Sequence, residues 1–267
     1  MNLASHFDLV IFDWAGTTVD FGCRAPVDAL REAFQRHGVS LTEPQVRRDM
    51  GKAKADHVRA LLDEPAIAAA WIAANGAPAG AVDHDALVRE LGPLMRSRAA
   101  GTATLIDGVA ATVGTLRAAG IRIASSTGYT REMMQPVIER AAAQGYAPEH
   151  LVCSGETPHG RPAPLMIYKA CAELGVWPLS RVVKVDDSEA GVAEGAAAGC
   201  LSVGVAASGN GVGLATAALA ALPALERQAR IDASARALYA AGADLVIDTA
   251  ADLVPAIERM LRERRDR

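Results

Sequence analysis

The most informative segment of this chain is Leu9-Val10-Ile11-Phe12-Asp13-Trp14-Ala15-Gly16-Thr17-Thr18-Val19. Its first four residues form a short apolar run, which is typical of a buried strand in a parallel sheet. Asp13 follows at the carboxyl end of that strand, the edge where ligands bind in open α/β sheets. Gly16 and the two threonines leave backbone N–H groups free to approach a phosphoryl oxygen. The segment therefore predicts a carboxylate nucleophile beside a phosphate-binding loop.

Similar runs rich in Val and Ile recur along the chain with helical stretches between them. With the first, they cover residues 8–12, 121–125, 151–153, 182–185, 201–205 and 244–247. This alternation predicts an α/β fold, in which a parallel sheet is covered by helices on both faces and joined by right-handed crossovers.

One long gap interrupts the alternation. From about residue 23 to residue 100 the apolar spacing is helical throughout, with Gly and Pro punctuation between the helices. This block predicts an inserted all-helical cap, with core residues 1–22 before it and 101–267 after it. The crossings near residues 21–25 and 98–102 are expected to act as hinges.

Composition narrows the class of protein. The chain has 267 residues, of which 51% are hydrophobic and 22% charged, and its net charge of −4 gives no field that would gather nucleic acid. The amino terminus lacks a basic region followed by a long apolar segment, so we expect a cytoplasmic protein. The longest apolar stretch, residues 212–225, is too short to span a membrane. Four cysteines without paired spacing predict free thiols.

Three more strand ends carry chemistry that matches Asp13. Ser125-Ser126-Thr127-Gly128-Tyr129 offers hydroxyls and backbone N–H groups, Arg161 in Gly-Arg-Pro-Ala-Pro offers a planar cation, and Asp186-Asp187 offers adjacent carboxylates. Each has an ordinary explanation when taken alone: a helix cap, a surface arginine or a turn. Carboxylates gathered near Asp13 would repel one another unless a hard cation such as Mg²⁺ neutralised them.

Taken together, the order Asp, Ser/Thr, Arg, Asp-Asp resembles the four motifs of the haloacid dehalogenase superfamily, over residues 8–199. The resemblance implies a Rossmann-like core in which the first Asp is transiently phosphorylated. By position, Asp13 would be the nucleophile and a Mg²⁺ ligand. The backbone carbonyl of Ala15 and the carboxylate of Asp187 would be further ligands. Whether Asp186 binds the metal stays open, because some members have Gly there.

The resemblance also implies a site for the phosphoryl group, formed by Thr127 with Gly128 and by Arg161. The chain departs from the usual Asp-x-Asp pattern at Ala15, because the second Asp protonates the leaving oxygen in phosphoester hydrolases of the superfamily. Without it an ordinary alkoxide would leave unprotonated. Another group must therefore make the leaving group depart.

The cap contains a candidate for that task in Met50-Gly51-Lys52-Ala53-Lys54-Ala55-Asp56-His57. If the residues from Gly51 onward are helical, Met50, Lys54 and His57 share one face, and Lys52 points elsewhere. The Lys54 amine could condense with a substrate aldehyde to give an iminium, which accepts electrons as carbon leaves phosphorus. Its pKa would have to fall from about 10.4 to about 7, and burial supplies a shift in that direction.

These residues resemble one subfamily closely, the phosphonoacetaldehyde hydrolases, which share the Asp-x-Ala-Gly-Thr-Thr start and the Met-Gly-x-x-Lys-x-x-His cap segment. The resemblance implies Mg²⁺-dependent hydrolysis of phosphonoacetaldehyde to acetaldehyde and phosphate, through a Lys54 imine and an Asp13 aspartyl phosphate. Met50 and His57 are candidates for assisting proton transfer, and Cys23 and Tyr129 for lining the substrate pocket. The family also implies a homodimer formed through the cap.

Three alternatives remain. A superfamily phosphatase or phosphomutase is disfavoured because both need the Asp that Ala15 replaces. A dehalogenase would need neither the metal pair nor an amine, and a non-catalytic phosphate-binding regulatory domain would be expected to have lost Asp13. Residues 209–213 are a poor match to a dinucleotide loop and are interpreted as a turn. The sequence assigns no chemistry to residues 209–241, and it does not identify the base that activates water.

Overall fold

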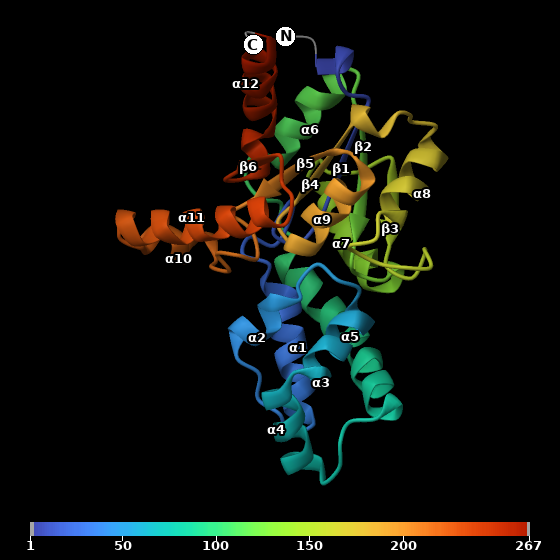
Figure 1. The fold of residues 1–267 in the computed structure, drawn as a ribbon, viewed down its shortest axis with the longest axis vertical. Coiled ribbons are helices and arrows are strands. Elements are labelled where there is room, and N and C mark those ends of the chain that lie inside the picture. The colour runs from blue at the N-terminus through green and yellow to red at the C-terminus, as the bar shows by residue number, and fades with distance from the viewer. Residues whose placement is uncertain (1–2, 266–267) are drawn as a thin grey trace.

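The computed structural model describes residues 3–265, which form a parallel sheet between two helical layers with a helical cap below its carboxyl edge (Figure 1). The strands are β1 (Leu9–Phe12), β2 (Arg122–Thr127), β3 (His150–Cys153), β4 (Val182–Asp186), β5 (Leu201–Val205) and β6 (Leu245–Ile247). All neighbours are parallel, in the order β3-β2-β1-β4-β5-β6. The α/β fold class is confirmed, with β1 at the centre.

Strand register brings the motifs level with one another. Phe12 of β1 pairs with Ser125 on one side and with Val185 on the other. The residues that follow, Asp13 among them, therefore emerge side by side at the same edge of the sheet.

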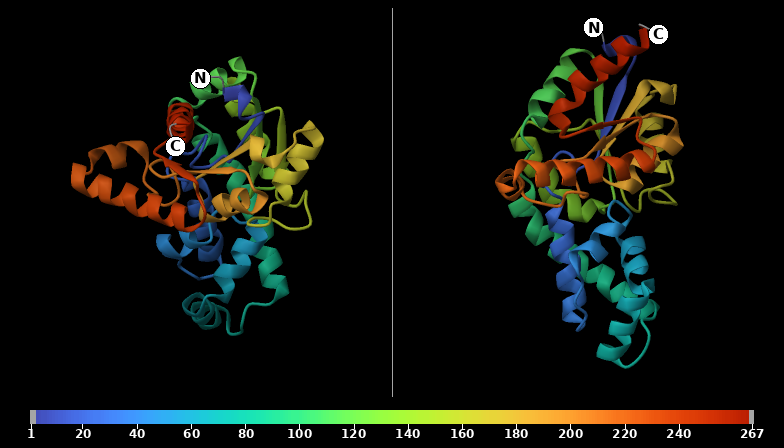
Figure 2. Two further views of the ribbon diagram at one scale, coloured as in Figure 1. Left: turned by 45° about the horizontal axis from the view of Figure 1, so that its top comes forward. Right: turned by 60° about the vertical axis from the view of Figure 1, so that its left-hand side comes forward.

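Alternation along β1 explains how the core is built. Val10 and Phe12 belong to one buried cluster, whereas Leu9 and Ile11 belong to another on the opposite face. The core helices that cover these faces are α6 (Val109–Ala118), α7 (Arg131–Ala143), α8 (Leu165–Leu174), α9 (Glu189–Ala198), α10 (Thr216–Ala221), α11 (Ala224–Ala240) and α12 (Leu253–Arg265). Helices α10 and α11 stand out from one side of the core (Figure 2).

The cap is built from helices alone, as expected from the sequence. They are α1 (Arg24–Arg36), α2 (Glu43–Arg48), α3 (Lys54–Asp63), α4 (Pro65–Asn75) and α5 (Ala81–Thr102). Within the cap, Phe34 and Trp71 meet edge to face with ring centroids 6.3 Å apart. The cap thus has an apolar centre, which is continuous with the buried cluster on one face of the sheet.

The two crossings between cap and core differ in structure. The first is a short segment in which Asp20, Gly22 and Cys23 have positive φ angles. The second lies within α5, which continues to Thr102 and packs against α7 of the core. The boundary near residue 100 and the two hinges stay predictions. Among residues 3–265, no helix has both the length and the apolar character needed to cross a bilayer.

Candidate active site

Asp13 lies directly after β1, where its backbone N–H continues the ladder by donating to the carbonyl oxygen of Val185 at 2.9 Å. The residue is only 6% exposed, and its Oδ1 accepts a hydrogen bond of 2.8 Å from Nη1 of Arg161. Burial and the nearby charge of Asp186 raise the pKa of Asp13 to about 6, against the opposing effect of Arg161. Asp13 is thus a buried carboxylate held by a cation.

The loop after Asp13 is folded tightly enough to bring two motifs into contact. The N–H groups of Thr17 and Thr18 both donate to the carbonyl oxygen of Trp14, at 3.2 and 2.8 Å. Gly16 has a φ of +89°, and a Cβ there would lie 2.2 Å from Oδ2 of Asp187. Glycine is therefore needed at this position both for the backbone conformation and for the approach of Asp187.

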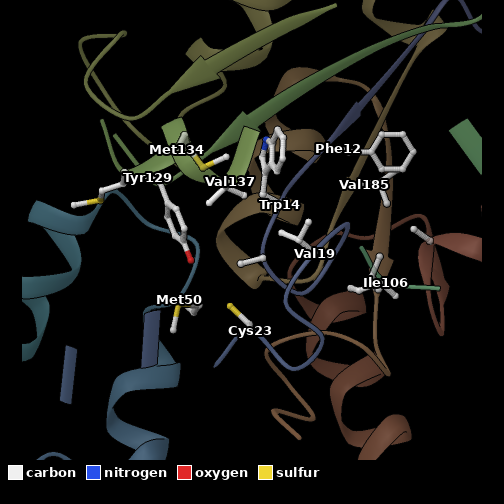
Figure 3. Packing of buried hydrophobic residues seen from close by; sticks show 14 of the residues in the cluster. Phe12, Trp14, Val19, Cys23, Met50, Ile106, Tyr129, Met134, Val137 and Val185 are labelled. Carbon is white, nitrogen blue, oxygen red and sulfur yellow. The ribbon is translucent and has the colours of Figure 1, made fainter. Parts of the chain in front are cut away.

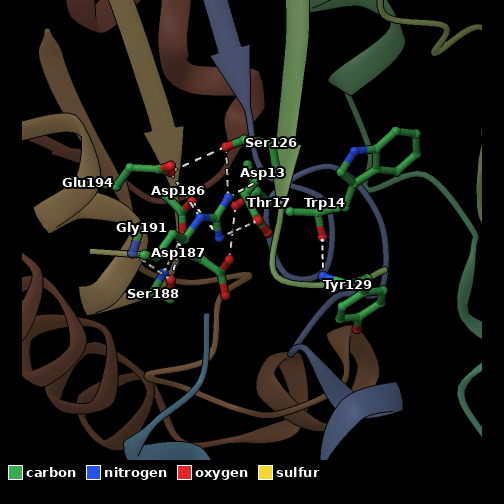
Figure 4. Close-up of polar contacts among 12 residues, drawn as sticks. Asp13, Trp14, Thr17, Ser126, Tyr129, Asp186, Asp187, Ser188, Gly191 and Glu194 are labelled. Carbon is green, nitrogen blue, oxygen red and sulfur yellow. Dashed lines mark hydrogen bonds and ion pairs between the residues drawn. The ribbon is translucent and has the colours of Figure 1, made fainter. Parts of the chain in front are cut away.

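Arg161 is at the centre of a buried polar network, and Figure 4 labels its partners Asp13, Ser126, Asp186 and Glu194. Its Nη2 donates to the carbonyl oxygen and to Oγ of Ser126 at 2.8 and 2.9 Å, and its Nε donates to Oε2 of Glu194 at 3.0 Å. With Asp13 and Asp186 on Nη1, the guanidinium is fixed from several sides. The guanidinium group of Arg161 is therefore held in one orientation before any anion binds.

Sequence reasoning did not identify Glu194 as part of the site, and it named Ser126 only as a member of the Ser125–Tyr129 motif, not as a partner of Arg161. Glu194 is fully buried on α9 and also lies 3.7 Å from Nζ of Lys184. The available signal was the helix itself, because residues 190–198 are otherwise Ala, Gly and Val. A single carboxylate on such an apolar, buried helix requires a cationic partner.

Asp186 is occupied by protein groups on both carboxylate oxygens. Oδ2 accepts from Nζ of Lys184 at 2.7 Å, and Oδ1 accepts from the N–H and Oγ of Ser188 at 3.0 and 2.7 Å. Burial raises the pKa of Asp186, but the charges of Arg161 and Lys184 outweigh it and hold the pKa below its ordinary value. Asp186 does not line the cavity described below.

Asp187 differs from its neighbour in its charge environment. Oδ1 accepts from Oγ1 of Thr17 at 3.0 Å and Oδ2 accepts from the N–H of Asn210 at 2.7 Å. Burial, followed by the charges of Asp13 and Asp186, raises the pKa of Asp187 well above its ordinary value. An added cation would relieve this repulsion.

The donor set fits a hard divalent ion. One carboxylate oxygen from each of Asp13, Asp186 and Asp187 lies within 4.8 Å of the others, and all three residues are buried. Magnesium prefers oxygen ligands and is commonly held by one or two carboxylates with phosphate and water. Asp13 and Asp187, which line the cavity together with Ala15, suit that role.

Lys54 faces the same cavity from the cap. Its side chain is 2% exposed, and its Nζ lies 4.0 Å from Sδ of Met50 and 5.1 Å from the ring centroid of Tyr129. Burial lowers the pKa of Lys54 to about 8, although the charges of Cys23 and Asp13 act in the opposite direction. A substantial fraction of the amine is therefore neutral near pH 8.

The prediction that the helix begins at Gly51 was wrong. Helix α3 begins at Lys54, and Gly51 has a φ of +89° in the preceding turn. The turn forms because Gly51 packs against the core: a Cβ there would lie 2.1 Å from Oγ of Ser188. Met50 still reaches Lys54, through the turn rather than along one helical face.

His57 lies one turn further along α3 than Lys54 and does not line the cavity. Its Nε2 is 2.8 Å from the carbonyl oxygen of Val46, which requires the proton to be on Nε2. Nδ1 is buried and has no hydrogen-bond partner among the described residues. Burial, followed by the charge of Lys54, lowers the pKa of His57 to about 3, so the ring is neutral.

The cap touches the core closely around one cavity. A Cβ on Gly128 would lie 2.5 Å from the carbonyl oxygen of Lys52, and a Cβ on Gly160 would lie 3.3 Å from Cβ of Ala53. Figure 3 shows the hydroxyl of Tyr129 pointing toward Met50 and Cys23 at this boundary. The structure therefore represents a closed arrangement of the cap.

The cavity has a volume of about 20 Å³ and gathers most of the residues that the sequence singled out. Its walls are Asp13, Ala15, Cys23, Met50, Gly51, Lys54, Thr127, Gly128, Tyr129, Arg161, Asp187 and Ser188. His57 and Asp186 are the two candidates that lie behind the walls. A buried amine on one side thus faces the carboxylates of Asp13 and Asp187 and a fixed arginine on the other.

Comparison with known proteins identifies the family. The family described as haloacid dehalogenase-like hydrolase matches residues 7–199. A phosphonoacetaldehyde hydrolase of Paraburkholderia phytofirmans is 46% identical over 252 residues, covering 94% of each chain. A phosphonoacetaldehyde hydrolase of Bacillus cereus is 38% identical over 256 residues, covering 96% of this chain and 97% of that one.

A solved structure agrees with these relatives. The phosphonoacetaldehyde hydrolase-like protein of Oleispira antarctica superposes with a TM-score of 0.94 at 37% identity, covering 97% of this chain and 94% of that chain. A predicted phosphoglycolate phosphatase of Haemophilus somnus, with a TM-score of 0.68 at 16% identity, shares the fold alone. The chain belongs to the haloacid dehalogenase-like hydrolases and, within them, to the family of phosphonoacetaldehyde hydrolases.

Proposed function

We propose that this protein hydrolyses the carbon–phosphorus bond of phosphonoacetaldehyde, giving acetaldehyde and phosphate. One observation carries the proposal: the buried Lys54 amine and the Asp13 carboxylate line the same cavity, with Ala15 where an acid for an oxygen leaving group would be. The names of the relatives support the choice of substrate.

The first step uses the neutral form of Lys54. Its nitrogen attacks the aldehyde carbon, and loss of water leaves an imine that carries the phosphonate on the neighbouring carbon. Burial supports this step, because it lowers the pKa of the amine to about 8. The protonated imine can accept the electron pair that carbon keeps when its bond to phosphorus breaks.

The second step breaks the bond to phosphorus. An oxygen of Asp13 attacks phosphorus, and the electron pair of the carbon–phosphorus bond moves toward the imine nitrogen to give an enamine on Lys54. Arg161 is oriented to bind the phosphoryl oxygens, with Thr127 and Gly128 beside it in the cavity wall. A carbon leaving group of this kind needs no acid at residue 15.

The remaining steps return the enzyme to its starting form. Protonation of the enamine carbon gives the imine of acetaldehyde, and water releases acetaldehyde from Lys54. A second water cleaves the aspartyl phosphate and regenerates Asp13. Mg²⁺ held by Asp13, the carbonyl of Ala15 and Asp187 would offset negative charge on the phosphoryl oxygens when bound.

His57 suits the role of a neutral hydrogen-bond acceptor near Lys54. Because Nε2 donates to Val46, the lone pair is on Nδ1, which is the atom left without a partner among the described residues. Burial lowers the pKa of His57 to about 3, so the ring is too weak a base to take the proton from the Lys54 amine, and we assign it a hydrogen-bonding role beside that amine. Met50, which accepts from the Lys54 amine, would keep that amine in place.

The deciding experiment traps the imine. Borohydride added with phosphonoacetaldehyde should label Lys54 covalently, and Lys54→Arg should lower turnover on the order of 10³-fold. Lys52→Arg is the matched control, since the Lys52 amine pairs with Asp49 in the cap. Label at no lysine, or near-normal turnover by Lys54→Arg, would rule out the imine route.

The rival functions give different results in the same assay. A phosphatase or phosphomutase would act on phosphate esters without labelling at Lys54, and a regulatory domain would release no phosphate at any Mg²⁺ concentration. Measuring phosphate and acetaldehyde together, with and without a chelator, separates these outcomes. A cytoplasmic location and a homodimer formed through the cap belong to the same proposal.

A further inference from the structure

Arg47, in the last turn of α2 in the cap, is held by groups of the core. Its Nη1 donates to the carbonyl oxygen of Gly22 at 3.0 Å and to Oδ1 of Asn210 at 3.1 Å. Its Nη2 donates to the carbonyl oxygen of Gly213 at 2.9 Å, and Nε donates to Glu43 in its own helix at 2.8 Å. The side chain is only 13% exposed. One cap residue thus binds both the first crossing and the loop after β5.

Asn210 in that loop connects the cap with the active site. Its side-chain Nδ2 donates back to the carbonyl oxygen of Arg47 at 3.0 Å, while its backbone N–H donates to Oδ2 of Asp187 at 2.7 Å. The same residue therefore contacts the cap with its side chain and an active-site carboxylate with its backbone.

The loop packs against Asp187 too tightly to move without it. A Cβ on Gly209 would lie 2.5 Å from Cβ of Asp187, and on the other side Oγ1 of Thr17 donates to Oδ1. Packed interiors transmit displacements of this kind, because there is no free volume to absorb them. A shift of residues 209–213 would change where the Asp187 carboxylate points.

The first crossing depends on the same contacts. Gly22 accepts from Arg47 and donates through its N–H to the carbonyl oxygen of Ser208 at 2.7 Å. On either side of it, Asp20 and Cys23 have φ values of 55° and 50°. Left-handed conformations cost non-glycine residues free energy and persist where surrounding bonds hold them. Rotation of the cap about this crossing would break the Arg47 bonds.

We propose that Arg47 and Asn210 form a latch that places the Asp187 carboxylate for metal and phosphoryl binding when the cap closes. Both are positioning residues, since neither lines the cavity. The proposal rests on the proposed function for the identity of the site at Asp187. It assigns a role to residues 209–213, and it requires metal binding and cap closure to favour each other.

The test measures Mg²⁺ binding by calorimetry without substrate, together with amide hydrogen exchange. Arg47→Met should weaken Mg²⁺ binding roughly fivefold or more and speed exchange of residues 20–23 and 209–213 roughly tenfold. Arg47→Lys keeps the charge but loses the several N–H donors of the guanidinium group. Its Mg²⁺ affinity and exchange rates should lie between those of Arg47→Met and wild type. Arg48→Met is the control: that side chain is 52% exposed, pairs with Asp49 and should leave both readouts unchanged.

The outcomes separate the latch from the function on which it rests. A wild-type protein that binds no Mg²⁺ would count against the proposed metal site, and the exchange measurement would then decide the latch alone. If Arg47→Met binds Mg²⁺ and exchanges like wild type, the latch is overturned. Should Arg47→Met fail to fold, Asn210→Ala removes the side-chain bonds between Arg47 and Asn210 while keeping the backbone N–H to Asp187 and the Arg47 bond to Gly22. It must then speed exchange of residues 209–213, and unchanged exchange there would overturn the latch.

Discussion

The carboxylate of Asp186 occupies the space in front of Gly191, where a Cβ would lie 2.0 Å from Cγ of Asp186. Gly191 is on α9, and its missing side chain lets Asp186 reach both Lys184 and Ser188. The pair works as a unit, because a side chain at residue 191 and a carboxylate at residue 186 cannot share this space. The buried charge of Lys184 therefore depends on a glycine in the next helix.

Gly191→Ala should displace Asp186 and leave Lys184 without its closest anion. Breaking a buried ion pair costs about 3 kcal/mol, which would lower the Tm of a protein of this size by roughly 6–12 °C. Gly114→Ala is the control, since Gly114 is inside α6 with nothing within 4 Å of its Cβ position. That change should stabilise by about 0.5–1 kcal/mol. Equal thermal shifts for the two variants would contradict the argument.

Imine formation should follow the titration of Lys54. Its pKa is lowered to about 8 by burial, so only about 1% of the amine is neutral at pH 6, and the fraction rises about tenfold per pH unit until it levels off above pH 8. The rate of borohydride-trapped labelling, measured from pH 6 to pH 10, checks this. A rate that keeps rising to pH 10 would indicate an ordinary lysine.

Ser126→Ala should weaken substrate binding more than the same substitution at a buried serine outside the site. Oγ of Ser126 accepts from Arg161 and Lys184, so its loss leaves two buried cations short of an acceptor, at a cost of about 1–3 kcal/mol. We expect the KM for phosphonoacetaldehyde to rise roughly tenfold as Arg161 loses its orientation. Ser202→Ala removes a buried hydroxyl that donates to the carbonyl oxygen of Val192, away from Arg161, and should lower stability yet keep the KM. A raised KM in both variants would point to a general packing defect.

Asp20→Asn should change how stability depends on pH. Burial raises the pKa of Asp20 to about 6 in the folded protein, from 3.8 in the unfolded chain. The folded state therefore binds the proton more tightly, and this stabilisation is lost as pH rises through 6. Between pH 5 and pH 7.5 the loss is about 1.4 kcal/mol. Asn keeps an oxygen for the N–H of Ala25 but does not titrate. Urea unfolding at both pH values should show the pH-dependent difference in stability shrink by about 1.4 kcal/mol in Asp20→Asn, and the part due to Asp13, whose pKa is also raised to about 6, should remain.

The strands and the positions of the motifs could be predicted from the sequence, because each is determined by a short run of neighbouring residues. Runs such as Leu9–Phe12 are apolar on both faces because a parallel sheet is buried on both sides, and a polar residue after such a run lies at the ligand-binding edge. That reasoning located Asp13, Arg161 and Asp187 without coordinates. It was wrong at Gly51, because a contact with Ser188, far away in the chain, decides where α3 begins.

What the sequence alone determined is the alternation of strands and helices, the inserted cap, and the pairing of an absent acid at Ala15 with an added amine at Lys54. Only the tertiary structure decided which groups surround them: Glu194 and Ser126 around Arg161, the neutral ring of His57 behind Lys54, and Asn210 between Arg47 and Asp187. The physical reason is the distance along the chain over which each property is determined. Hydrophobic period and strand-end chemistry are local properties, whereas burial, pKa shifts and bonds across 160 or more residues exist only once the chain has folded.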